Sequence, residues 1–442
     1  MEQGDAKLFV GPTNTNTLLP THSSARVGLV LFALWLMVFA AASQIMIVSP
    51  ILPDIARELN VETGRLGSLI SVYAIMLGIF SLVAGPVSDR LGRRIILLAG
   101  TLSMGVVLLL HGLAHSFWVL LGMRMLAGAA GGLLSGAAVA YVGDFFPYER
   151  RGWANGWVMS GIALGQVLGI PAGKILATQL GFEWPFVAYG FVMLLAGFLT
   201  WRFVPQPDVQ LAKDRVTFGG AFRSYRALLA QPAPRAAVVG YALMFLAIGL
   251  FIPYFPLWLE NEIGLSGNAI AGLFLVGGLA NLATGPMAGK LSDRVGRKPL
   301  VVASCVLFAV ALLSTPYVVT GLVTAYVFFA LAMVSVAMRI APLQSLVSAL
   351  VPDSQRGVMM SGAVSVGQVG MATGAGLAGL IYATFGIGGN TVGATVAVAL
   401  MAVVVVYFLP EPKGDTPGPP THTPIPPVET SESRPAPSHV AA

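Results

Sequence analysis

The chain consists of long apolar runs separated by short polar segments. Hydrophobic residue types make up 56% of it and charged residues only 10%, whereas a soluble domain carries about 25% charged residues. About 20 apolar residues suffice to cross a bilayer as a helix, and lipid requires every peptide group to be hydrogen-bonded internally. We therefore predict an all-α membrane protein with twelve spanning helices, at residues 27–52, 66–87, 95–114, 117–143, 155–178, 185–204, 236–258, 268–288, 299–319, 320–345, 357–383 and 391–409.

The distribution of positive charge predicts how these helices are oriented. With both termini on one side, 20 of the 25 Lys and Arg residues fall in segments on that same side. Basic residues accumulate in cytoplasmic loops of membrane proteins, so we predict cytoplasmic termini in a multi-pass protein of a cell membrane, in a bacterium the inner membrane. The net charge of +6 is explained by this topology, and we predict the lipid bilayer, not nucleic acid, as a partner.

The predicted helices fall into two groups of six. We predict a cytoplasmic tail at 1–25, a first bundle at 26–204, a cytoplasmic linker at 205–235, a second bundle at 236–410 and a cytoplasmic tail at 411–442. The last segment is rich in Pro, Thr and Ser and has too little apolar surface to fold, so we expect it to be disordered. We predict a monomer without a cofactor or a metal site.

A charged cassette of ten residues occurs twice in this apolar chain. Gly85–Arg94 recurs as Gly289–Lys298, 204 residues later, with Gly, Ser, Asp, Arg, Gly and Arg at matching positions. Each copy lies between two apolar runs, so the repeat relates two membrane-embedded halves. Gly85 and Gly92 are predicted at a close-packing and a tight-turn position. Internal duplication of this kind is typical of secondary transporters, in which the substrate site lies between the halves.

The two cassettes resemble the signature loop of the major facilitator superfamily, which lies between helices 2 and 3 and recurs between helices 8 and 9. The resemblance implies two pseudo-symmetric six-helix bundles that rock about a central cavity, so that the cavity opens to each side in turn. We assign conformational gating to the cassettes and to an acidic residue at the end of helix 4. The residues concerned are Gly85, Asp89, Arg90, Gly92, Arg93, Arg94, Asp144, Gly289, Asp293, Arg294, Gly296 and Arg297.

The cassette aspartates lie at helix ends, where a physical role can be argued. Asp89 and Asp293 can face the start of a helix in the opposite bundle, near Gly357 and Gly152 respectively. A carboxylate at a helix N-terminus stabilises by about 0.3–1 kcal/mol when exposed and up to about 2 kcal/mol when partly buried. Such contacts would form only when the cytoplasmic side is closed, and would bias the two-state equilibrium. The cassette arginines can hold Asp89, pair with Asp144, or serve only as topology anchors.

Two further stretches resemble motifs of proton-coupled exporters in that superfamily. Helix 4 carries Arg124 among glycines, and an arginine inside a spanning segment is costly enough to suggest function; snorkelling to the outer interface is the alternative. Helix 5 carries Gly165, Gly169, Pro171 and Gly173, similar to the glycine-rich antiporter motif, with one residue inserted before the proline. Small residues at this spacing also serve ordinary helix packing.

Charged and polar residues are rare in the predicted spans. All 19 acidic residues fall in loops, tails or helix ends, so no proton carrier is identified, and Asp54 and Asp144 are the nearest candidates. Arg339 lies about 20 Å along helix 10 from the cytoplasmic loop, where it would bind an anionic group, serve coupling or make structural hydrogen bonds. The candidates for substrate binding or coupling are Arg124, Arg339, Gln44, Asp54, Gln166 and Gln368.

These features predict a secondary active transporter and not an enzyme, because the sequence offers no convergent set of His, Asp, Glu and Ser. The resemblance and the sparsely polar helices predict export of small amphipathic, drug-like molecules, by proton antiport through alternating access. The alternative is an importer or facilitator of an organic anion or another small metabolite, with Arg339 holding a carboxylate. The sequence leaves the substrate and the carrier of the coupling ion open.

The gating role of Asp89 is testable by the substitution Asp89→Asn. We expect the variant to fold and to shift the population away from the form that is closed on the cytoplasmic side, because the charge–dipole contact is lost. Double electron–electron resonance between spin labels on the two bundles measures these populations. Populations equal to those of the wild type would contradict the role.

Overall fold

The apolar runs form helices throughout the described part of the chain. The computed structural model describes residues 24–207, 225–352 and 355–410, without the side chains of Ser24, Ala25, Gly85, Pro86, Asp89 and Tyr148. The predicted tails lie outside these residues except for positions 24 and 25, as do residues 208–224 of the predicted linker. Within the described residues every regular element is helical, as expected for a backbone that must satisfy its own hydrogen bonds in lipid.

The first half contains six crossing segments, most of them divided by a short break. They are α1 (Ser24–Met46) with α2 (Val48–Glu58); α3 (Thr63–Leu66) with α4 (Ser68–Leu91); α5 (Arg93–Leu110) with the 3-10 turn η1 (His111–Leu113); α6 (Phe117–Leu134) with α7 (Ala137–Phe145); α8 (Tyr148–Leu164), the π turn η2 (Gly165–Gly169) and α9 (Ile170–Leu180); and α10 (Trp184–Phe203). The break between α6 and α7 includes Gly136 at φ 75°, a left-handed conformation that glycine adopts readily.

The second half contains the other six crossing segments in fewer helices. They are α12 (Pro232–Phe251) with α13 (Phe255–Asn261), α14 (Gly267–Val295), α15 (Arg297–Val318), α16 (Leu322–Ser348) and α17 (Arg356–Phe408). α17 has 53 residues, about 80 Å at 1.5 Å per residue, whereas the hydrocarbon core is only about 30 Å thick. Gly386, at φ 63° and ψ −163°, interrupts the helical backbone and divides α17 into two crossing helices.

The twelve predicted spans are therefore all found. Eleven helices among the described residues are long and apolar enough to cross a membrane, and the last of them contains two predicted spans. Several predicted ends were wrong: the first helix continues after a break at Ile47 to Glu58, and the second bundle begins at Pro232. Only the part of a helix in the hydrocarbon needs apolar side chains, so polar residues extend helices beyond the ends that hydropathy indicates.

The two cassettes have the same backbone conformation. Both were predicted as short gaps between helices, but residues 85–91 continue α4 and residues 289–295 continue α14. The turn is a single glycine in each case, Gly92 at φ 97° and ψ 145° and Gly296 at φ 99° and ψ 148°. The tight turn predicted at Gly92 is confirmed. These backbone angles favour glycine strongly, which explains why both copies keep it.

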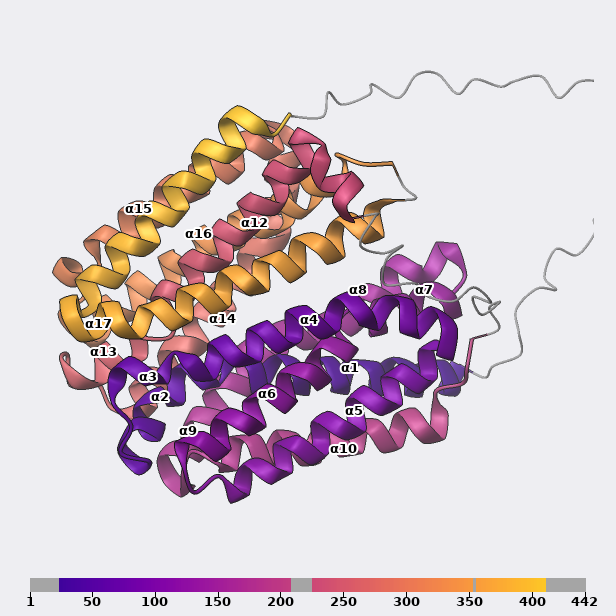
Figure 1. Cartoon of the computed structure of the whole chain (residues 1–442), viewed down its shortest axis with the longest axis horizontal. Helices are drawn as coiled ribbons and strands as arrows, with labels where there is room; N and C mark the ends of the chain where they lie inside the picture. The colour runs from indigo at the N-terminus through magenta and orange to yellow at the C-terminus, as the bar shows by residue number, and fades with distance from the viewer. Residues whose placement is uncertain (1–23, 208–224, 353–354, 411–442) are drawn as a thin grey trace, which may run out of the picture. The chain divides into compact units, whose positions relative to one another are not determined.

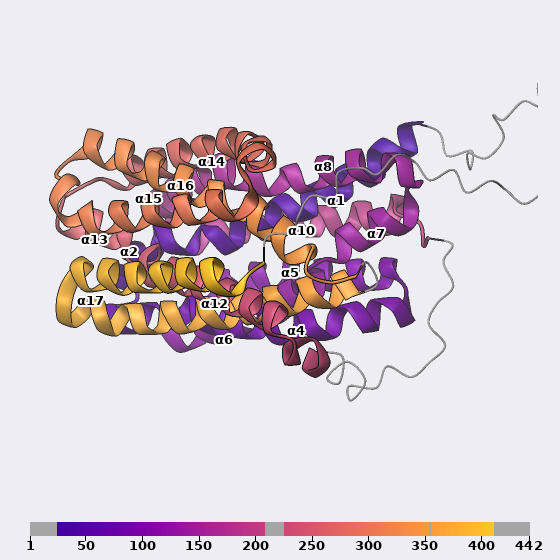
Figure 2. The same cartoon turned by 90° about the horizontal axis from the view of Figure 1, so that it is seen from above.

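The halves pack tightly at the end that carries α2, α3 and α13. A Cβ on Gly67 of the first half would overlap the carbonyl of Ala375, and one on Gly379 would overlap the carbonyl of Gly64. Figure 1 shows α4 and α17 alongside each other at this end. Figure 2 shows α17 beside α12, its main neighbour in the second half. We call this the ion-pair end, for the charged residues described below.

The opposite end carries both cassettes, and we call it the cassette end. Here a Cβ added at Gly152, Gly289 or Gly357 would meet nothing within 4 Å. The ribbons of the two halves also diverge toward this end in Figure 1. Contacts between the halves reach past the middle of α4, where the hydroxyls of Ser81 and Ser365 are 3.0 Å apart. The structure is thus tightly packed between the halves at one end and more open at the other.

The turn in α17 provides a matched pair of substitutions. A Cβ at Gly386 or at Gly388 would meet no neighbour within 4 Å, but only Gly386 has a positive φ. We expect Gly386→Ala to destabilise the fold by about 1–3 kcal/mol through backbone strain and Gly388→Ala to leave stability equal or higher. Thermal unfolding of both variants in detergent measures this. Equal unfolding temperatures for the two would contradict the strained turn.

Candidate functional site

The cassette arginines bind groups of their own half. Arg93 Nε donates to Asp144 Oδ2 at 2.7 Å, which joins α5 to α7. Arg94 donates to the carbonyl of Trp201 on α10 at 2.6 Å. In the second half, Arg297 Nη1 reaches the carbonyl of Ser345 on α16 at 3.5 Å. The predicted option of a pair with Asp144 is realised by Arg93, so the cassette ties the helices of one half together.

The other cassette residues are placed on the surface. Arg90, Asp293 and Arg294 are exposed, and Asp293 has no ion-pair partner among the residues that the structure describes. The side chain of Asp89, like Gly85, lies outside the description. The contacts predicted for the two aspartates belong to a state closed at the cassette end, and they remain predictions.

Arg124 lies in the interior of the first half. Its side chain is 1% exposed, so the alternative that it snorkels to the interface was wrong. Nη1 donates to Gln44 Oε1 at 3.1 Å, and Gln44 Nε2 donates to the Tyr73 hydroxyl at 3.0 Å. The guanidinium carbon also lies 4.3 Å from the centre of the Tyr73 ring. One neutral acceptor and an aromatic face thus compensate the charge of Arg124, and the geometry suits a cation–π contact.

His111 is a buried neighbour of this arginine. The residue is fully buried, with Nδ1 at 2.8 Å from the carbonyl of Val107. Its ring centre is 4.5 Å from that of Phe186, and Phe186 lies 5.7 Å from the guanidinium carbon of Arg124. Nε2 of His111 has no hydrogen-bond partner within the described ranges. Packing by α10 thus covers the end of α5 and the η1 turn that carries His111.

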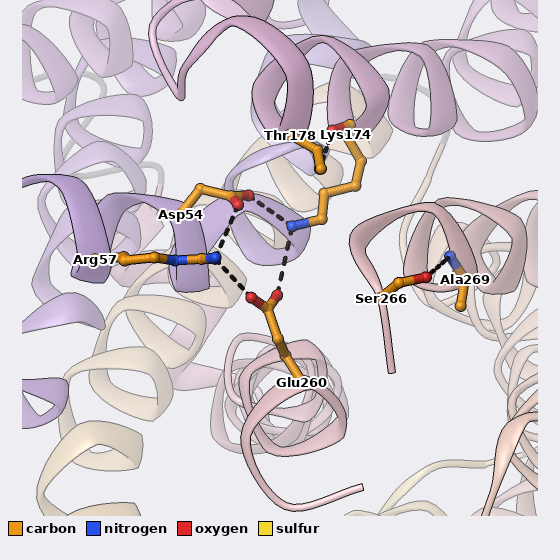
Figure 3. A network of polar contacts seen from close by, with 7 residues as sticks. All are labelled: Asp54, Arg57, Lys174, Thr178, Glu260, Ser266 and Ala269. Carbon is orange, nitrogen blue, oxygen red and sulfur yellow. Dashed lines mark hydrogen bonds and ion pairs between the residues drawn. The ribbon is translucent and has the colours of Figure 1, made fainter. Parts of the chain in front are cut away.

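An ion-pair cluster of Asp54, Arg57, Lys174 and Glu260 joins the two halves (Figure 3). Lys174 Nζ lies 2.6 Å from Asp54 Oδ2 and 3.7 Å from Glu260 Oε2. Arg57 Nη2 lies 2.6 Å from Glu260 Oε1 and 3.2 Å from Asp54 Oδ1. Asp54 and Arg57 are on α2, Lys174 is on α9 and Glu260 is on α13. The cluster therefore connects two helices of the first half to one helix of the second.

Burial separates an inner and an outer pair in the ion-pair cluster. The side chains of Lys174 and Asp54 are 0% and 7% exposed, whereas Glu260 is 20% and Arg57 64% exposed. The four charges sum to zero, so each buried charge has a counter-charge. A buried pair loses much more than an exposed pair when one member is removed. The inner pair of Lys174 and Asp54 should accordingly dominate the energetics.

The glycines of the fifth crossing segment pack against α1 and against Ile47, the residue that follows it. A Cβ at Gly165 would lie 3.1 Å from Ser43 Oγ, one at Gly169 would lie 2.7 Å from Ser43 Cβ, and one at Gly173 would lie 2.8 Å from Ile47 Cδ1. The packing role predicted for these small residues is thus realised within the first half, while an antiporter role for this stretch, including Pro171, stays a prediction.

Amides and hydroxyls form the central contact between the halves. Asn281 Nδ2 of α14 donates to Gln166 Oε1 of the π turn at 2.7 Å, and Ser71 Oγ donates to the carbonyl of Ala372 at 2.6 Å. Gln368 of α17 is half-buried, and a Cβ at Gly78 would lie 3.4 Å from its Cβ. The structure therefore brings Gln166 and Gln368 to the junction of the halves, whereas Gln44 serves Arg124.

Arg339 lies away from that junction. It is fully buried on α16, with its guanidinium carbon 4.5 Å from the ring centre of Phe308 on α15. α15 packs mainly on α16 and α17, within the second half. No group of three His, Cys, Asp or Glu side chains suited to a metal ion occurs in the searched, described residues.

The inner pair of the cluster can be tested by a double-mutant cycle. Lys174→Met and Asp54→Asn should each destabilise the protein, by about 3–5 kcal/mol where the change leaves a buried charge unpaired. The double variant should lose much less than the sum, because it buries no unpaired charge. Thermal unfolding of the four proteins in detergent gives the coupling energy. Strictly additive losses would show that the two side chains are not coupled.

Comparison with known proteins identifies the family. The chain matches the family model of the Major Facilitator Superfamily over residues 34–275 and 237–437. Multidrug resistance protein MdtG of Escherichia coli O6:K15:H31 (strain 536 / UPEC) is 30% identical over 302 residues, which are 66% of this chain and 73% of that protein. The structure of a D-xylose-proton symporter matches with a TM-score of 0.71 at 18% identity, over 88% of this chain and 100% of that one.

A bacterial homologue of the human lysosomal transporter Spinster, solved in an inward-facing and unoccupied conformation, matches with a TM-score of 0.66 at 18% identity, over 88% of this chain and 96% of that one. These likenesses to solved structures establish the shared fold, and the family match covers most of the chain. This chain belongs to the major facilitator superfamily and is a multi-pass membrane transporter, not an enzyme.

Proposed function

We propose that this transporter exports small amphipathic, drug-like molecules in exchange for protons, by alternating access. The observation that carries the proposal is the ion-pair cluster, which joins the halves at one end while the glycines at the cassette end face open space. The likeness to relatives named multidrug resistance protein MdtG supports the substrate class. The positive charge of the two cassettes supports a cytoplasmic location for the cassette end.

Alternating access requires contacts that exist in one state and are lost in the other. Glu260 is the only member of the ion-pair cluster in the second half, so opening the ion-pair end would separate it from Arg57 and Lys174. The buried inner pair would then meet water. The cluster thus stabilises the state that is closed at the ion-pair end, and in the proposed orientation this state is open to the cytoplasm.

External protons would act on the same cluster. Protonation of Asp54 or Glu260 removes one negative charge and leaves the cluster with a net charge of +1, which weakens the closed state. Burial and the neighbouring Glu183 carboxylate raise the pKa of the adjacent Glu58, so this end also carries a carboxyl group that binds protons more readily than usual. Protonation from outside would therefore favour the outward-open state, in which an exported solute is released, and release of that proton to the cytoplasm would let the cluster re-form in the inward-open state.

The junction between the halves favours a weakly polar solute. Away from the ion-pair end, the polar side chains described at this junction are uncharged, for example the Gln166–Asn281 and Ser81–Ser365 pairs and half-buried Gln368. Import of an organic anion held by Arg339 is less well supported, because Arg339 points to α15 within one half and not to the junction.

Proton flux in everted membrane vesicles tests the proposal. Lipophilic cations, neutral drugs, organic anions and sugars are added in turn to vesicles with a preformed pH gradient. We expect the lipophilic cations and neutral drugs to collapse the gradient in vesicles that contain the transporter and not in vesicles from cells with an empty vector. A response confined to organic anions or sugars, or none at all, would contradict drug-like export by proton antiport.

Variants of the ion-pair cluster test the coupling step. Asp54→Asn and Glu260→Gln should lower the solute-evoked flux per molecule of folded transporter by about tenfold, in the range of typical coupling energies. Glu62→Gln is the matched control, because Glu62 is an exposed carboxylate near the same end whose ion-pair partner among the described residues is neighbouring Arg65, at 3.4 Å. Equal flux from all three variants would exclude a coupling role for the cluster.

A further inference from the structure

The interior of the second half contains a positive charge without a counter-ion. Arg339 is 0% exposed, and none of its three guanidinium nitrogens has a hydrogen-bond acceptor among the described residues. An arginine does not lose its charge in proteins. Arg124, which is also buried, donates a hydrogen bond to Gln44. Arg339 therefore differs from Arg124 in having no oxygen acceptor among the described residues, with the Cys305 thiol as its polar neighbour.

The neighbours of Arg339 provide a hydroxyl and a thiol but no negative charge. Ser304, Cys305 and Phe308 lie about one helical turn apart or less on α15. All three are at most 1% exposed. Phe308 stacks against the guanidinium, and Cys305 is the polar neighbour shared by Arg339 and Ser304. The Ser304 hydroxyl also has no hydrogen-bond partner within the described part of the chain. The guanidinium of Arg339 and the hydroxyl of Ser304 thus both adjoin the Cys305 thiol among buried side chains.

We propose that Arg339 and Ser304 bind a small monovalent anion between α15 and α16. An isolated charge in a low-dielectric interior is strongly unfavourable unless an opposite charge or a full set of hydrogen bonds compensates it. One anion supplies both the counter-charge and acceptors for the free N–H and O–H groups. The complete burial of the surrounding side chains restricts the ligand to a small ion, such as a halide or a short carboxylate.

This anion has a structural role separate from the transported solute. α15 packs on α16 and α17 of its own half, so the bound ion would connect two helices of one bundle and would not move between the bundles. Since the proposal concerns one half only, it does not depend on the proposed export function, and its test uses no transport measurement.

Anion-dependent thermal unfolding of the purified full-length transporter tests the site. The protein is exchanged into gluconate, and chloride, bromide or acetate is titrated at constant ionic strength. We expect a saturable rise of several degrees in the unfolding temperature of the wild type, because a ligand that binds the folded state stabilises it. The response should vanish in Arg339→Met and persist in Arg235→Met, where an exposed arginine is removed.

The separate titrations identify the kind of anion and can overturn the proposal. A response to chloride and bromide assigns an inorganic ion, whereas a response to acetate alone assigns a carboxylate. No response in the wild type, or an equal response in Arg339→Met, would refute the site. If Arg339→Met does not fold, Ser304→Val keeps the charge and should weaken anion affinity about tenfold, as loss of a hydrogen bond to a charged group does. Unchanged affinity in Ser304→Val would also refute it.

Discussion

A charged side chain removed from water must find an opposite charge or enough hydrogen bonds, and this requirement organises the polar interior of the transporter. The ion-pair cluster meets it most completely, because Lys174 has a carboxylate on each side of the junction between the halves. Arg124 meets it with a neutral amide acceptor and the face of Tyr73. Arg339 has the Phe308 ring and the Cys305 thiol, and no counter-charge among the described residues. Lys174, Arg124 and Arg339 thus differ in how completely opposite charges or hydrogen-bond acceptors compensate their buried positive charge.

The two ends of the molecule use charge differently. At the cassette end the arginines bind acceptors within one half, as Arg93 does with Asp144, and so make each half rigid. At the ion-pair end Arg57 and Lys174 bind Glu260 across the junction. Rigid halves joined by charges that can separate are the physical requirement for a rocking motion, since packed cores have discrete arrangements and do not deform continuously.

Most of the fold could be predicted from the sequence, because it depends on local properties of the chain. The twelve spans follow from apolar length, and the turn at Gly92 follows from the conformational freedom of glycine. The partners within the site could not be predicted, since Asp54 and Lys174 are 120 residues apart and only folding brings them together. One signal was present: Lys174 departs from the cytoplasmic pattern of basic residues, and a charge out of place in a span requires a partner. Burial of His111 depends on packing by α10 and left no signal in the sequence.

The π turn determines which neighbouring helix the residues of the fifth crossing segment face. Successive glycines four residues apart drift by about 40° around an α-helix, so three steps would carry a contact stripe about 120° away from a straight neighbour. Gly161, Gly165 and Gly169 nevertheless all face α1, and Gly173 faces Ile47, the residue directly after it. A π turn winds by a smaller angle per residue, since its hydrogen bonds span one residue more, and it therefore offsets the drift. The same unwinding carries Gln166 to the side of α14, so one local irregularity keeps a helix in register with a neighbour in its own half and directs an amide to the other half.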